Sequence, residues 1–212
     1  QFILPDGKRV LVVDYKTSTK QTEYVLQVDD LDAPESWGAG KWLRSPSPDS
    51  PNPADVLGSW QGAFHLIEEE EGTLGLRAPQ VGALYATLAH WTVSDGEATV
   101  VLPTGTGKTE TMLAVYTHER LEKLLVIVPT DALRTQLGGK FQTLGVLKEF
   151  GIMAPQALYP HVGYLTKGFE AAADAQDFLD KSNVVVATMS IIGACSGEAR
   201  KVIAEGFSHM FV

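Results

Sequence analysis

Hydrophobic positions in the second part of the chain alternate between a helical period and short, densely apolar runs. Val81, Leu84, Leu88 and Trp91 recur at the spacing of one helix face. Apolar or β-branched runs predict a buried strand at 97–102 and further strands at 124–128, 183–189 and 207–212. Helical patterns follow residue 107 and cover 131–147, 169–182 and 191–205. This alternation predicts an α/β fold, a parallel sheet covered by helices on both faces.

The first part of the chain predicts a separate, small β module over residues 1–44. "FIL" and "RVLVVDY" flank residues 5–8, which have the composition of a hairpin turn, and "TEYVLQVDD" is a third strand candidate. Four prolines in "SPSPDSPNP", residues 45–53, predict a stretch that forms no helix and packs no core, and the linker is placed over 45–60. The α/β domain is then expected over 61–212.

Bulk composition limits the classes of function. The net charge of −9 excludes a protein that binds nucleic acid through its overall charge, so any such contact must be local. Cys195 is the only cysteine, which excludes an internal disulfide and fits a cytoplasmic protein. Its position beside Ile191 and Ile192 favours a buried structural thiol over a nucleophile. No apolar run is long enough to span a membrane, and no membrane partner is expected.

The stretch "VVLPTGTGKTET" at 100–111 joins a predicted strand to a predicted helix. Glycines at 105 and 107 allow close approach to phosphates, and the loop N–H groups and helix dipole favour an anion. Lys108 is placed to reach the β- and γ-phosphates of ATP, and the Thr109 hydroxyl to hold Mg²⁺; both are predicted catalytic residues. A glycine-rich turn with a surface lysine is the alternative. The predicted nucleotide-binding residues of the loop are Thr104, Gly105, Thr106, Gly107, Lys108, Thr109 and Glu110.

The loop "PTGTGKT", with Pro-Thr-Gly in place of a first glycine, resembles that of superfamily 2 helicases and translocases. Upstream, "LRAPQ" resembles the adenine-binding motif of that family, which implies contacts from Arg77 and Gln80. The amide of Gln80 has both a donor and an acceptor for the adenine edge. A plain helix start, with Pro79 at an early position, is the alternative for this segment.

Two downstream segments carry the same resemblance. "LLVIVPTDALRTQ" resembles motif Ia, which implies that Thr130 and Arg134 contact a nucleic-acid phosphate; the alternative is helix capping by Thr130 or Asp131. "NVVVATMSII" resembles motif Ic and implies a nucleic-acid contact from Thr188; an ordinary strand threonine is the alternative.

Together these motifs imply the first RecA-like domain of a DEAD/DEAH-type helicase or translocase over 76–212, near the type III restriction branch. The resemblance implies ATP and Mg²⁺ as cofactors, DNA rather than RNA as the favoured partner, and protein partners in a multi-subunit system. In the family, a strand like "FSHMFV" leads into Asp-Glu-Ala-Asp or Asp-Glu-Ala-His. We therefore expect the chain to be a segment that ends just before this motif and turns over ATP negligibly by itself.

Two other classes of function stay open from the sequence. A kinase-like P-loop enzyme would share Lys108 and Thr109 but would respond to a small acceptor molecule and not to nucleic acid. An adaptor would bind a partner through the β module without ATP.

Overall fold

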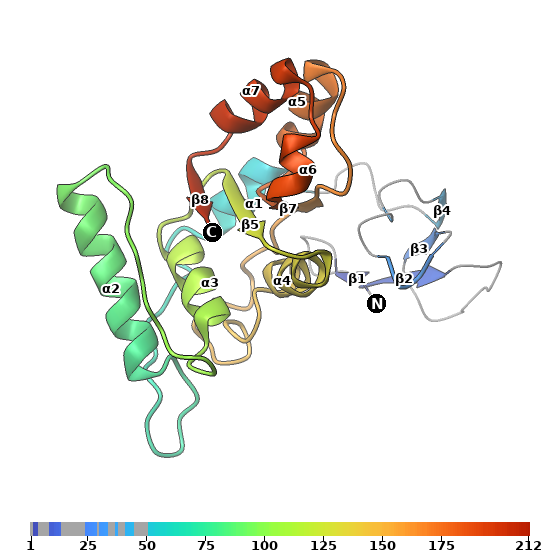
Figure 1. Cartoon of the computed structure of the whole chain (residues 1–212). Helices are drawn as coiled ribbons and strands as arrows, with labels where there is room; N and C mark the ends of the chain where they lie inside the picture. Colours follow the sequence, from blue (N-terminus) through green and yellow to red (C-terminus); the bar gives the residue numbers. More distant parts are fainter. Residues whose placement is uncertain are drawn as a thin grey trace.

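The structure is a computed structural model that describes residues 2–3, 9–13, 24–28, 30–33, 37, 41–44 and 51–212 (Figure 1). The predicted turn at 5–8 and the linker residues 45–50 lie outside this part. Within it, one four-stranded sheet has the order β1-β2-β3-β4 and a second has the order β6-β7-β5-β8.

The first sheet confirms β structure in the N-terminal part. Strand β2 pairs antiparallel with β1 and parallel with β3, and β3 pairs antiparallel with β4. Val10, Val12, Leu26 and Val28 form a small core, against which Trp37 packs. Trp37 therefore covers part of this core. The strands are β1 Phe2–Ile3, β2 Arg9–Val13, β3 Tyr24–Gln27 and β4 Lys41–Arg44.

The second sheet is entirely parallel, as the sequence predicts for an α/β fold. Its two central strands, β5 and β7, are buried along their whole length. Their side chains alternate between two cores, so that Leu124 and Val126 enter one and Leu125 and Ile127 the other. The strands are β5 Leu124–Val128, β6 Val162–Tyr164, β7 Val184–Thr188 and β8 His209–Phe211.

Helices cover both faces of this sheet (Figure 1). Side chains of α1 to α4 form the larger core with one face, and α5 and α7 supply the smaller core on the other. Among the described helices, none is long and apolar enough to cross a membrane. The helices are α1 Pro53–Ser59, α2 Ala78–Val93, α3 Lys108–His118, α4 Asp131–Thr143, α5 Ala172–Asp180, α6 Met189–Gly193 and α7 Gly197–Glu205.

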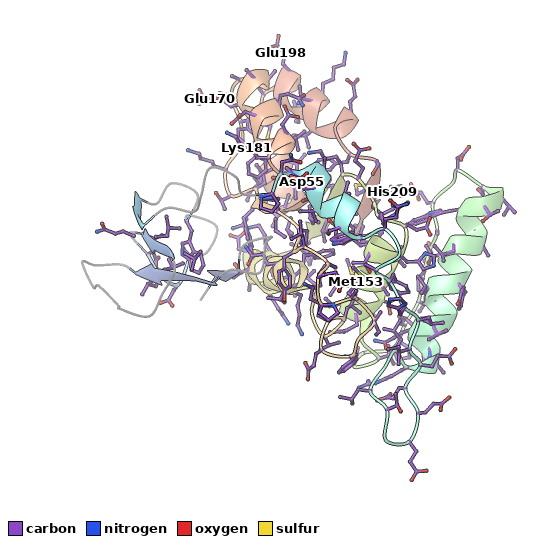
Figure 2. All side chains as sticks on the ribbon, turned by 180° about the vertical axis from the view of Figure 1, so that it is seen from behind. Asp55, Met153, Glu170, Lys181, Glu198 and His209 are labelled. Atoms are coloured by element: carbon purple, nitrogen blue, oxygen red, sulfur yellow. The ribbon has the colours of Figure 1, made fainter. Side chains whose placement is uncertain are left out.

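Helix α1 begins at Pro53, the last residue of the proline-rich stretch that is predicted to form no helix, and covers most of the other residues assigned to the linker. The Asn52 side chain accepts hydrogen bonds from the N–H groups of Ala54 and Asp55, and Pro53 occupies the first turn, where its missing N–H costs nothing. Val56 and Trp60 are buried in the larger core, and the Trp60 indole donates to the carbonyl of Leu158 at 2.8 Å. Figure 2 shows α1, marked by Asp55, from the side opposite to Figure 1.

The predicted buried strand at 97–102 is wrong. This segment pairs with no strand in the described part of the chain, and Val101 is 85% exposed. It forms the extended connection between α2 and α3 (Figure 1). A β-branched run has strand propensity, but a strand forms only where a neighbouring backbone offers a ladder, and this run has none. The other three predicted strands are confirmed.

Two predicted helices are shorter than expected. The helix predicted over 131–147 ends at Thr143, because Leu144 and Gly145 take left-handed backbone angles. The helix predicted over 191–205 divides into α6 and α7, since the Ser196 hydroxyl caps α7 by accepting from the N–H of Ala199. Cys195 lies buried at this division, which confirms its structural role.

Asn183 joins α1 to the sheet and offers the first test. It is 1% exposed; its amide donates to the carbonyl of Pro53 at 2.9 Å and accepts from the N–H of His161 at 3.0 Å. We predict that Asn183→Ala lowers the free energy of unfolding by about 1–3 kcal/mol, because a buried acceptor and donor lose their partners. Urea denaturation measures this. Gln176→Ala, which removes an exposed hydrogen bond to Asp180, is the control, and an equal loss in both variants would contradict the prediction.

His161 makes stability depend on pH. Burial lowers the pKa of its imidazole, although the hydrogen bond with the carbonyl of Pro51 opposes the shift. The folded state therefore binds fewer protons than the unfolded state, so stability is present above the ordinary histidine pKa of about 6.5 and falls as the pH drops below it. We predict that His161→Gln flattens this fall in urea titrations between neutral and mildly acidic pH. His65→Gln, at an exposed position, should leave it unchanged.

Candidate nucleotide site and nucleic-acid edge

The glycine-rich loop, residues 103–107, leads directly into α3. Gly105 and Gly107 both have φ of +83°, a left-handed angle that favours glycine, and Gly107 is the N-cap residue of α3. Helix α3 follows the loop as predicted, although the loop does not follow a strand. The local geometry therefore depends on the two glycines and on contacts with neighbouring helices.

Lys108 and Thr106 both bind the carbonyl oxygen of Pro103. The Lys108 ammonium donates to it at 3.0 Å and the Thr106 hydroxyl at 2.6 Å, while the Thr106 N–H adds a third donor at 3.3 Å. Three donors on one carbonyl fold the loop onto itself. Lys108 is otherwise exposed, so its ammonium is accessible to an incoming anion.

The start of α2 holds the loop from the side. The Arg77 guanidinium donates to the carbonyl of Gly105 at 3.1 Å, and the Gln80 amide donates to the carbonyl of Gly107 at 3.0 Å. Gln80 is 4% exposed and also accepts from the N–H of Arg77 at 2.7 Å. This segment therefore starts α2, with Pro79 in its first turn, and also contacts the glycine-rich loop. The ion pair of Arg77 with Glu69, at 3.4 Å, fixes the guanidinium further.

A cleft of about 250 Å³ opens between α2 and the loop. Its lining includes five residues predicted from the sequence to bind nucleotide: Arg77, Gln80, Gly105, Gly107 and Glu110. Sequence reasoning missed the apolar part of the lining, from Leu76, Val146 and Phe150. Val146 and Phe150 come from a turn-rich segment after α4 that carries no motif. Only their proximity in the fold reveals them.

The predicted residues Thr104, Thr106, Lys108 and Thr109 are not among the residues that line this cleft. Thr104 is exposed, Thr109 is half-buried in the first turn of α3, and Glu110 pairs with Lys140 of α4 at 3.6 Å. No group of three acidic, histidine or cysteine residues in the described chain is arranged to hold a metal ion. Mg²⁺ in such a loop needs only the Thr109 hydroxyl together with phosphate oxygens and water, and the position of Thr109 fits that donor set.

The predicted nucleic-acid residues gather at the carboxyl edge of the parallel sheet. Thr188 ends β7 and pairs in register with Val128, the last residue of β5; Thr130 follows two residues later. Thr130 is exposed, and its hydroxyl caps α4 by accepting from the N–H of Leu133 at 3.3 Å. The Thr188 hydroxyl is within 3.0 Å of the Ser190 hydroxyl. Capping by Thr130, the alternative role, is therefore observed.

Arg134 is less accessible than the sequence suggests. Its side chain is 4% exposed, and its guanidinium donates to the Asp131 carboxylate at 2.8 Å. The positive charge of Arg134 is therefore buried near the start of α4 and partly neutralised by the Asp131 carboxylate.

The amino-acid sequence matches a known protein family. Residues 73–212, about two thirds of the chain, match the family described as type III restriction enzyme, res subunit. The chain belongs to this family. Membership confirms the predicted family resemblance and a RecA-like, helicase-type ATP-binding domain. No curated protein that was compared matches the chain.

Gly107 in this res-subunit domain offers a test of the contact between the loop and α2. A Cβ at Gly107 would lie 2.0 Å from the Gln80 amide nitrogen, whereas a Cβ at Gly105 meets nothing within 4 Å. We predict that Gly105→Ala costs about 1–3 kcal/mol from left-handed strain alone, and that Gly107→Ala costs more because of the collision. Urea denaturation measures both.

The same variants in a Gln80→Ala background separate strain from collision. Removing the amide should reduce the difference between Gly107→Ala and Gly105→Ala, since the collision with Gln80 is gone and only strain and a 3.3 Å contact with the Glu110 carboxylate remain. Equal costs in the wild-type background would show that Gln80 does not constrain the loop.

Proposed function

We propose that the chain binds ATP and Mg²⁺ at residues 103–109 and forms part of a nucleic-acid-dependent helicase or translocase. One observation supports the proposal most. Gly105 and Gly107, the two left-handed glycines just before α3, accept hydrogen bonds from Arg77 and Gln80 at the start of α2, in a chain of the res-subunit family. DNA is the favoured polymer, protein subunits are the expected partners, and a cytoplasmic location is part of the proposal.

The loop would receive the phosphates through its backbone N–H groups and the N-terminus of α3. Lys108 would leave the Pro103 carbonyl for the β- and γ-phosphates, which are stronger acceptors because they are charged. Thr109 would contribute its hydroxyl to Mg²⁺. Gln80 would offer its amide to the adenine edge, with Arg77 beside it.

Nucleic acid would bind at the carboxyl edge of the sheet. Thr130 and Thr188 contribute hydroxyls there, and the helix N-terminus after Thr130 adds N–H groups, which suits phosphate oxygens and gives little sequence preference. Arg134 would contribute charge after its guanidinium leaves Asp131. Such local contacts are compatible with the net charge of −9.

Lys108→Ala tests the nucleotide site. Calorimetric titration of the chain with ATP and Mg²⁺, up to millimolar concentration, should show about 10–100-fold weaker binding in this variant, since it removes a charge-assisted hydrogen bond. Lys201→Ala, which removes an exposed ammonium beside Glu205 on α7, is the matched control and should bind like wild type.

The same titration with single-stranded DNA, duplex DNA or RNA tests the partner. ATP should bind more tightly when the preferred polymer is present, because coupling between the two sites is reciprocal, and phosphate release is measured in parallel. ATP binding that ignores every polymer and responds to a small acceptor molecule would favour the kinase-like alternative instead. ATP-independent binding of a protein partner by residues 1–44 would favour the adaptor.

A further inference from the structure

The cleft beside the glycine-rich loop has an apolar wall to which Leu76, the first residue of "LRAPQ", contributes, but which comes mainly from outside the loop and this motif. Val146 and Phe150 form this wall together with Leu76. The polar residues Arg77 and Gln80 line the same cleft. The cleft thus presents an apolar surface and polar groups to the same ligand.

Backbone hydrogen bonds fix the wall. Helix α4 ends where Leu144 and Gly145 adopt left-handed angles, and the N–H of Gly145 donates to the carbonyl of Lys140 at 2.8 Å. The N–H of Phe150 then donates to the carbonyl of Val146 at 2.9 Å. Leu147 and Ile152, on either side of Phe150 in sequence, are fully buried and anchor the segment in the larger core.

Phe150 itself is only half-buried. Part of its side chain packs against the larger core, while the residue also lines the cleft. An aromatic ring held in this way presents a rigid apolar surface at low entropic cost. Aromatic rings stack on nucleobases irrespective of the base's hydrogen-bonding pattern.

The size of the cleft restricts what it accepts. Its volume of about 250 Å³ is below the range of roughly 300–1,000 Å³ that is usual for whole drug-sized ligands. A single flat heterocycle fits, whereas a nucleotide needs a continuation for its phosphates. Gly105 and Gly107 belong to the same lining, so phosphates at the loop and a ring against Phe150 can come from one molecule.

We propose that Phe150 is the stacking platform for the base of the bound nucleotide and that Val146 completes this apolar wall. The proposal rests on the proposed ATP site. Phe150 determines affinity for the base, while the loop determines affinity for the phosphates. Removing the aromatic face therefore weakens binding of ATP without affecting a ligand that consists of phosphates alone.

The experiment compares ATP with inorganic tripolyphosphate, each with Mg²⁺, by calorimetric titration of the full 212-residue chain. Phe150→Leu keeps an apolar side chain for the core and removes the ring; Phe150→Tyr keeps the ring. Phe178→Leu makes the same chemical change at a half-buried phenylalanine of the smaller core and is the matched control. Thermal unfolding of each variant verifies that it is folded.

Phe150→Leu is expected to weaken ATP binding by about 5- to 100-fold and leave tripolyphosphate binding unchanged, while Phe150→Tyr and Phe178→Leu bind both ligands like wild type. ATP binding within two-fold of wild type, or an equal loss for both ligands, overturns the role of Phe150. Failure of the ATP site itself gives a different result: wild type and Lys108→Ala would then bind both ligands equally poorly.

Discussion

The parallel ladder between β5 and β7 is the constraint on which the α/β part of the molecule depends. Both strands are buried throughout, and alternate side chains divide between the two cores, so neither core is complete without this pair. The register that sets Val128 opposite Thr188 also brings the starts of α4 and α6 to one edge. Packing of the apolar strands thereby positions the polar residues proposed to contact nucleic acid.

The glycine-rich loop is positioned by different means. It has no strand before it, and its carbonyls accept hydrogen bonds from Arg77 and Gln80 at the start of α2. The side chain of Gln80 occupies the space that a Cβ at Gly107 would need. The residues proposed to bind adenine are therefore also the ones that hold the loop, so the proposed base site and the proposed phosphate site share the same hydrogen bonds.

The sequence predicts features that depend on local pattern and misses those that depend on distant partners. The strand predicted at 124–128 has the same bounds in the structure, because apolar side chains suit a strand that is buried on both faces. The run at 97–102 also contains β-branched and apolar residues, but it lacks a ladder partner in the described part of the chain, which no local pattern reveals. The proline-rich composition of 45–53 does not predict the helix start that Asn52 and Pro53 form. For the candidate site, the loop motif identifies the polar lining, whereas Phe150 lies more than forty residues away and carries no motif.

The loop as it stands is satisfied by its own backbone, and this limits how a nucleotide enters it. The carbonyl of Pro103 accepts the Lys108 ammonium and two donors from Thr106, so binding of phosphate must first break a set of existing hydrogen bonds. A neutral carbonyl is a weaker acceptor for an ammonium than a phosphate oxygen, by about a factor of two in hydrogen-bond strength. Exchange of acceptors therefore favours the bound state while keeping Lys108 ordered in the free one. Arg77 and Gln80 hold the carbonyls of Gly105 and Gly107, and these two hydrogen bonds do not involve Lys108. The proposed binding would therefore require rearrangement mainly of Lys108 and of the Thr106 donors on the Pro103 carbonyl.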